Sequence, residues 1–172
     1  MNNNILKSFC VKVFERGLAI SSYIFPIIEI SYSFGLKVFS GTNNIFLNYC
    51  YFNYIAKLNV IYTNNVYLIF VLMVGIFMVC SRGTLPLSKF LRYNIIQAIL
   101  LNILCSCVGS SFAYFPVAIC ESLIGNLISN CMYLGTMGLA LSAATLIIFG
   151  GYPRIPVLSE AARLQVQRGY LD

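Results

Sequence analysis

Four long apolar stretches, separated by shorter polar segments, restrict the fold of this sequence more than any other feature. They cover residues 17–34, 62–80, 90–115 and 123–149, and a helix needs roughly 20 such residues to cross the hydrocarbon core of a bilayer. Only 9% of the residues are charged, whereas soluble domains have about 25%, so a water-facing surface would lack its polar coat. We therefore expect an all-α integral membrane protein, with four transmembrane helices that form a single membrane domain over residues 1–172.

The segments between the stretches predict how the helices are joined. Residues 35–61 are rich in Asn and in Tyr, and Tyr favours the membrane–water interface. We therefore expect an interfacial loop there, in the form of a re-entrant or surface-lying helix. Pro86 breaks the chain before the third stretch, and Ser88 is placed to cap the helix that follows.

A polar tail over residues 150–172 follows the last stretch. At about 100° per residue, several apolar side chains of this tail share one helical face: Val157, Leu158, Ala161 and Leu164. The pattern predicts a short amphipathic C-terminal helix that lies at the membrane interface.

Lys and Arg are distributed unequally between the two sides of a four-span bundle. Nine of the eleven lie in the N-terminal segment, in the connection between the second and third stretches, and in the tail, at positions 7, 12, 16, 82, 89, 92, 154, 163 and 168. Only Lys37 and Lys57 fall on the opposite side. The positive-inside rule then places both termini on the same, cytoplasm-like side. Membrane orientation also explains the net charge of +6, so we expect no nucleic-acid partner.

Enzyme, metal and cofactor sites are not expected from this sequence. It contains no His for a catalytic triad, and its five acidic residues are scattered. Its seven Cys form no Cys-x-x-Cys pair, and most of them lie inside the apolar stretches. We expect these Cys to be small core or lipid-facing residues.

Polar side chains inside the apolar stretches are the candidate functional residues. Glu29 lies in the middle of the first stretch, where a charge costs about 2.5 to 3.5 kcal/mol on insertion scales, so it should face a partner or a wet cavity. The third stretch carries Arg92, Asn94, Gln97 and Asn102, and its three amides fall within an arc of roughly 140° on a helix. Amides that face lipid would be unsatisfied, so this face should contact other helices. Two interpretations stay open, namely hydrogen bonding between helices and the lining of a polar path.

Three motifs, taken in chain order, resemble one known family. The segment RGTLPLSKFLRYNIIQAILLNIL, at residues 82–104, is a basic, proline-containing turn that leads into an Arg-aromatic-Asn-x-x-Gln motif. The first stretch contains YIFPIIE at residues 23–29, and the tail contains IPVLSEAA at residues 155–162. Together they resemble the Tic-twenty family, the twenty-kilodalton subunit of the chloroplast inner-envelope protein translocon. Asn102 departs from that family's pattern, in which an Asp is expected, and the Asn- and Tyr-rich first loop is atypical.

The resemblance implies a multi-pass protein of the plastid (chloroplast) inner envelope, with both termini in the stroma and a part in moving precursor proteins across the membrane. It implies as partners the other inner-envelope translocon subunits, precursor proteins in transit and the lipid bilayer, with a homo-oligomer as a further option. The candidate path or assembly residues are then Glu29, Arg92, Asn94, Gln97 and Asn102. A basic turn would lie at the stromal mouth, formed by Arg82, Lys89 and Arg92.

The origin of the chain and two other function classes stay open. Residues 1–16 do not resemble a transit peptide, which favours a plastid-encoded form or a bacterial relative. One alternative function is a non-conducting scaffold or assembly subunit of a membrane complex. The other is a small-solute or ion carrier.

Overall fold

The computed structural model describes residues 3–40, 45–83 and 87–168 of the 172 in the chain, and all secondary structure in these ranges is helical. Three helical runs in the described part are long and apolar enough to cross a membrane, namely Cys10–Ser40, Lys89–Ala113 and Leu123–Ile148. The bent pair Asn48–Asn64 and Val66–Arg82 supplies a fourth if its two halves form one span. An all-helical fold with three or four candidate membrane spans is therefore confirmed.

The first span is a series of helical segments rather than one regular helix. It contains α1 (Asn3–Ser22), α2 (Ile24–Ile30), the π-helix η1 (Ser31–Gly35) and α3 (Leu36–Ser40). Pro26 explains the break at Tyr23, because its ring offers no N–H to the Ser22 carbonyl and clashes with it. The helical run is longer than the predicted 17–34, since no Pro or Gly interrupts residues 3–16 and α3 continues beyond η1.

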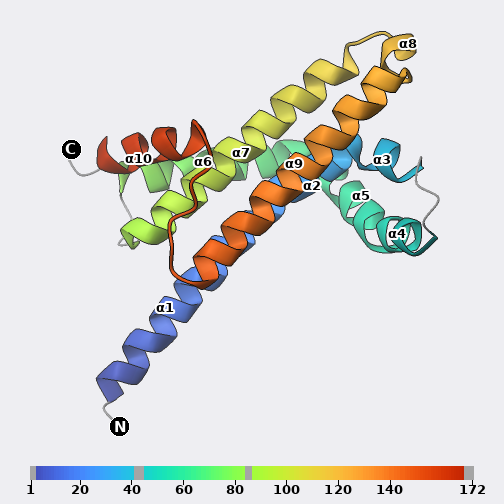
Figure 1. The fold of residues 1–172 in the computed structure, drawn as a ribbon. Coiled ribbons are helices and arrows are strands. Elements are labelled where there is room, and N and C mark those ends of the chain that lie inside the picture. The colour runs from blue at the N-terminus through green and yellow to red at the C-terminus, as the bar shows by residue number, and fades with distance from the viewer. Residues whose placement is uncertain (1–2, 41–44, 84–86, 169–172) are drawn as a thin grey trace.

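The centre of the bundle is α2, which packs against both α7 (Lys89–Ala113) and α9 (Leu123–Ile148). Figure 1 shows α7 and α9 as two long helices that follow the same diagonal and are joined at one end through the short α8 (Val117–Cys120). At the other end α1 continues past the bundle towards the N-terminus (Figure 1). Both long helices begin and end within two residues of the predicted spans 90–115 and 123–149.

Serine side chains fix where the two long helices begin. The Ser88 hydroxyl oxygen accepts a hydrogen bond from the Leu91 amide at 3.2 Å, which confirms its predicted role as the cap of α7. Ser122 caps α9 in the same way, since its hydroxyl oxygen accepts from the Gly125 amide at 3.2 Å. Pro86, the predicted chain break, lies outside the described residues.

The second span is broken at Asn65, where α5 (Ala56–Asn64) ends and α6 (Val66–Arg82) begins, and the helices on the two sides of the break are bent by 81°. Asn65 leaves the helical region of backbone conformation with φ −122° and ψ 20°, and its side-chain amide donates to the Ile61 carbonyl at 2.9 Å. The predicted span 62–80 therefore needs correction, because Tyr62 belongs to the preceding helix.

The segment predicted as an interfacial loop, residues 35–61, is helical wherever it is described. It contains α3, α4 (Ile45–Cys50), the π-helix η2 (Tyr51–Ile55) and the first part of α5. The Ser31 carbonyl in η1 accepts hydrogen bonds from the Tyr51 hydroxyl at 3.4 Å and from the Asn59 amide at 3.3 Å. This helical segment is therefore packed on the middle of the first span.

The C-terminal tail folds back onto the bundle through α10 (Leu158–Arg168), which packs against α6 and α7. Its buried side chains are Ala162 and Val166, whereas Val157 and Leu164 on the predicted apolar face are 82% and 53% exposed. The predicted apolar face therefore lies on the outside of the bundle, and its placement at the membrane interface stays a prediction. Val157, with φ 66°, precedes the helix. The small Ala162 side chain lets α10 approach α6 closely.

The topology leads to a labelling prediction for single-cysteine chains in sealed vesicles. We expect Cys10 and a cysteine introduced by Lys89→Cys to react with an impermeant maleimide from one side, and Cys50 from the other, because nine of the eleven Lys and Arg lie in the segments on one side of a four-span bundle. Cys10 and Lys89 are exposed and Cys50 is half-buried, so all three positions are open to reagent. Labelling of Cys50 and Lys89→Cys from the same side would instead mean that α5 and α6 form a re-entrant loop.

Candidate functional site

The five polar residues singled out in the apolar stretches are all buried within the bundle. Exposed fractions are 0% for Asn94 and Gln97, 2% for Arg92 and Asn102, and 6% for Glu29. Neighbouring segments of the chain cover these side chains, so they form no continuous exposed surface. Their structural partners therefore decide what each of them does.

Arg92 joins the end of α6 to the beginning of α7. Its Nε donates to the Cys80 carbonyl at 2.7 Å, and its Nη2 donates to the Ser81 carbonyl at 3.1 Å. These carbonyls belong to the last turn of α6, where the backbone carries partial negative charge and lacks helical donors. Arg92 is thus a helix cap, and of the predicted basic turn only Arg82 and Lys89 are exposed.

Gln97 connects three parts of the chain that are far apart in sequence. Its Nε2 donates to the Pro153 carbonyl at 3.3 Å, and its Oε1 accepts from the Tyr23 hydroxyl at 3.2 Å. The Tyr93 hydroxyl donates to the same Pro153 carbonyl at 2.8 Å. The segment that follows α9 is therefore fastened to α7 and to the break between α1 and α2.

A second polar cluster surrounds Glu29 on α2. The Glu29 carboxylate accepts a hydrogen bond from the Tyr62 hydroxyl at the end of α5, and Asn102 of α7 lies beside that hydroxyl. One helical turn further along α7, the Cys105 thiol lies 3.7 Å from the Thr136 hydroxyl of α9. The cluster thus ties the first span, the broken second span and both long helices together beside the break at Asn65.

Two amide oxygens in this interior have no partner among the described residues. They are Oδ1 of Asn94 and Oδ1 of Asn102. The Asn94 amide nitrogen instead donates back to the Phe90 carbonyl at 2.8 Å, one turn earlier in α7. Gln97 and Asn102 thus have partners outside α7, as expected for hydrogen bonding between helices, whereas Asn94 bonds within its own helix.

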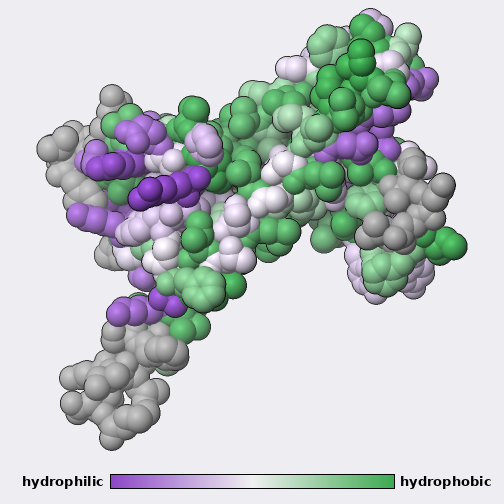
Figure 2. Space-filling view, viewed as in Figure 1, coloured by the Kyte–Doolittle hydropathy of each residue, from purple (hydrophilic) through white to green (hydrophobic). Residues whose placement is uncertain are grey.

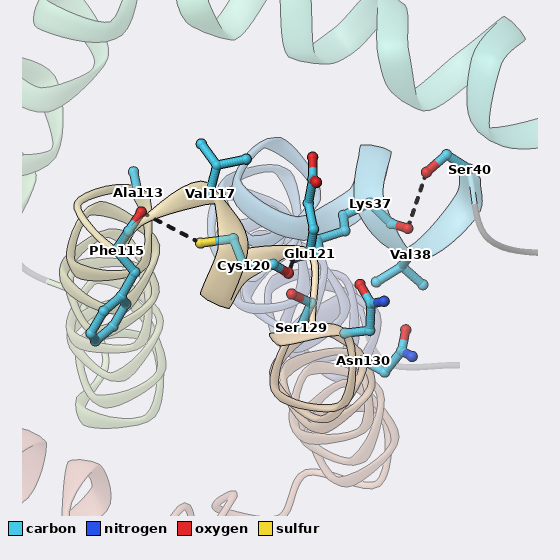
Figure 3. Close-up of a pocket in the computed structure, with 11 residues that line it drawn as sticks. Lys37, Val38, Ser40, Ala113, Phe115, Val117, Cys120, Glu121, Ser129 and Asn130 are labelled. Carbon is cyan, nitrogen blue, oxygen red and sulfur yellow. Dashed lines mark hydrogen bonds between the residues drawn. The ribbon is translucent and has the colours of Figure 1, made fainter. Parts of the chain in front are cut away.

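The exposed polar site lies at the end of the bundle where α8 joins the two long helices. A cleft of about 740 Å³ opens between α3, α8 and the first turns of α9 (Figure 3). Its polar lining consists of Lys37, Ser40, Glu121, Asn126, Ser129 and Asn130, and Val38, Phe115 and Val117 add apolar surface. Asn126, Asn130 and Glu121 are exposed, so their polar groups are open to a ligand or a partner chain.

Lys37 fixes the wall that α3 contributes to this cleft. Its Nζ donates to the Cys120 carbonyl of α8 (Figure 3). The same Nζ lies 5.0 Å from the centroid of the Phe112 ring on α7. The Ser40 hydroxyl donates to the Lys37 carbonyl at 3.2 Å, which holds the end of α3. The lysine thus connects three helices and leaves the amides of α9 facing the opening.

Comparison with known families gives this geometry its context. The family model described as "Chloroplast import apparatus Tic20-like" matches residues 11–162. The chain belongs to the Tic20-like family.

Similar Tic20-family proteins occur in red algae and in a cyanobacterium. A "Tic20 family protein Ycf60" from Cyanidium caldarium is 27% identical over 164 residues, which cover 95% of this chain and 79% of that protein. A protein of the same name from Cyanidioschyzon merolae is 29% identical over 155 residues, covering 90% of this chain and 77% of the relative. The "Tic20 family protein" of Synechocystis is 29% identical over 157 residues, covering 89% of this chain and 93% of the relative. No solved structure matches the chain.

The motifs that resemble this family meet in the folded Tic20-like chain. Tyr23 opens the first motif, Gln97 belongs to the second, and Pro153 lies two residues before the third. The hydrogen bonds at Gln97 join the first two motifs to each other and to the segment directly before the third. The sequence pattern therefore marks the residues that hold the bundle together.

Sequence reasoning missed Tyr62 and Lys37, although each has an indirect signal. Tyr62 lies beside the break at Asn65, and a buried carboxylate such as Glu29 requires a donor from elsewhere in the chain. Lys37 follows the first predicted span, and a Lys at the end of a span is usually counted only as evidence for membrane orientation. The cleft itself depends on the angle of α8, which no residue pattern predicts.

Proposed function

We propose that this protein is a membrane subunit of a protein-import translocon, located in the inner envelope of a plastid and contributing to the path of precursor proteins. The observation that carries the proposal is the match of the Tic20-like family model to residues 11–162. A plastid-encoded form is favoured because the two algal relatives carry the name Ycf60. We propose no enzymatic activity for it.

The cleft between α3, α8 and α9 is the part of the molecule best suited to contact a precursor. An extended polypeptide has unpaired backbone N–H and C=O groups, which need polar partners wherever water is excluded. Asn126 and Asn130 offer both donors and acceptors on one face of α9, and Val117 and Phe115 offer apolar contact. The buried residues Asn94 and Gln97 are not available for this role, because the chain's own tail and first span cover them.

A closed pore within one chain is not part of the proposal. The interior of the bundle is filled by its own side chains, from Ile30 and Leu101 to Ala143 and Ile147. Other translocon subunits, or further copies of this chain, would complete the path around the cleft. The stromal location of both termini belongs to the same proposal.

A scaffold role without a path is the second candidate function. It is favoured by the use of Arg92 and Gln97 as internal connectors, which makes the bundle a rigid unit suited to holding a complex together. A small-solute carrier is a further alternative, and reconstitution of the chain alone followed by a flux measurement would detect it.

Site-specific photocrosslinking distinguishes the precursor-path function from the scaffold function. A photoreactive amino acid at Asn126 or Asn130 should capture a precursor that is arrested in transit. The same group at Cys131 or Leu134 should not, since both are exposed on α9 but lie outside the cleft. Capture only by other subunits, with none at Asn126 or Asn130, would refute the path proposal and favour the scaffold.

A further inference from the structure

A basic cleft lies at the end of the bundle opposite α8. It has a volume of about 600 Å³ and is lined by the first turn of α7, the segment after α9, and α10. Three of its lining side chains are cationic and one is anionic, namely Lys89, Arg154, Arg163 and Glu160. Figure 2 shows hydrophilic atoms (purple) gathered over α10 on this side of the molecule. An excess of positive charge in a concave site favours an anionic ligand.

The walls of this cleft are held in place by specific contacts. The Tyr152 ring packs edge-on against Phe90 and Tyr93, with 5.3 Å between ring centroids in each pair. The Tyr93 hydroxyl donates to the Pro153 carbonyl at 2.8 Å, which fixes the backbone next to Arg154. Arg154 is therefore attached to a backbone segment that is held in place. Ala162 is buried and anchors α10, which fixes the backbone at the neighbouring Arg163.

Its surroundings match the boundary between water and the membrane. Lys89 is the first residue of α7, a candidate membrane span, and the lining residues Tyr93 and Tyr152 are of the aromatic type that gathers at lipid headgroups. The side chains of Val157 and Leu164, which are close in sequence to Arg154 and Arg163, are 82% and 53% exposed. Basic groups can bind the headgroup of a lipid while exposed apolar side chains contact its acyl chains. A soluble acidic peptide would be bound by the basic groups alone.

We propose that this cleft binds the headgroup of an anionic phospholipid. The cations Lys89, Arg154 and Arg163 would surround its phosphate, with Tyr152 and Ser159 as neighbouring polar groups and the acyl chains directed along the exposed apolar side chains. Each basic residue near an anionic membrane surface contributes a factor of roughly five in affinity. The inference is independent of whether the chain conducts a precursor.

The test measures lipid binding to the full chain in micelles of a neutral detergent, by native mass spectrometry and by titration. We expect phosphatidylglycerol to bind more tightly than phosphatidylcholine. The double variant Arg154→Gln/Arg163→Gln should lose roughly 5- to 25-fold of that preference. Arg82→Gln, at an exposed cation outside the cleft, should keep it. Glu160→Gln should increase the preference, because it removes the one anion in the lining.

Three results would overturn the proposal. One is an unchanged lipid preference in the double variant with an unchanged melting temperature. Another is displacement of the lipid by millimolar inorganic phosphate, which would assign the cleft to free phosphate. The third is binding of an acidic peptide in place of phosphatidylglycerol, which would assign it to a partner protein. If the double variant melts earlier, Glu160→Gln decides, since a lipid site requires tighter binding of phosphatidylglycerol.

Discussion

Replacing Arg92 with Met should lower the free energy of unfolding by about 3 to 5 kcal/mol, the largest loss expected from a single change in this protein. The guanidinium donates to the Cys80 and Ser81 carbonyls, and hydrogen bonds from a charged donor are each worth about 1.5 to 3 kcal/mol. Without them the last turn of α6 loses the donors to two of its carbonyls, one of which belongs to the buried Cys80. Equilibrium unfolding in mixed micelles, followed by circular dichroism, measures the loss.

Arg82→Met is the matched control for this change. Arg82 is the last residue of α6 and belongs to the same predicted basic turn as Arg92, but its side chain is exposed. Its replacement should therefore change stability by no more than about 0.5 kcal/mol. Arg92→Lys should fall between the two, because an ammonium keeps the charge but lacks the fork that reaches two carbonyls. Equal stability of Arg92→Met and Arg82→Met would show that the cap contributes nothing.

Tyr62→Phe should lower the free energy of unfolding by roughly 2 to 3 kcal/mol, because it removes the donor to the buried Glu29 carboxylate. The change removes a single oxygen atom, so packing is preserved. Tyr67→Phe is the control, since Tyr67 is 86% exposed and should tolerate the same loss with little effect. Thermal and denaturant unfolding of the three chains in the same micelles give the comparison.

The double variant Glu29→Leu/Tyr62→Phe tests whether the two groups act as a pair. A single replacement leaves the other polar group buried without its partner, and this costs stability. The double variant removes both groups, so it should lower the free energy of unfolding by less than the sum of the two single changes. We expect a coupling energy on the order of 1 to 3 kcal/mol in a double-mutant cycle. Strictly additive single effects would mean that the hydroxyl does not stabilise the carboxylate.

The sequence predicted the long helices well and the broken one poorly. α7 and α9 combine an uninterrupted apolar run with a serine cap, and both signals are local. The break at Asn65 directly follows the polar residues Thr63 and Asn64, a local signal that the predicted span did not use, and the packing of α5 on the first span accompanies its angle. The face of α10 that carries Ala162 and Val166 is buried by docking on α6 and α7, a contact that the residue pattern of the tail did not predict.

For the polar residues, sequence reasoning predicted the types that would be buried but not what they do. The partners of Arg92 and Gln97 are backbone carbonyls at Cys80, Ser81 and Pro153, and a carbonyl has no sequence signature. A buried polar residue can line a path or hydrogen-bond to the chain's own backbone. Which of the two it does depends on which backbone segment the fold places against its side chain. The two clefts were not predicted, since each is formed by segments that meet only in the folded bundle.

The Pro153 carbonyl gives this protein a late step in its biogenesis. Tyr93 and Gln97 precede their common partner by 60 and 56 residues, so both are synthesised before it. At typical elongation rates of about 5 to 20 residues per second, the interval is roughly 3 to 12 s. During that time the Tyr93 hydroxyl and the Gln97 amide nitrogen lack the acceptor that they share in the complete fold. Chains truncated before residue 153 would never gain that acceptor, so their tail could not be fastened to α7 in this way.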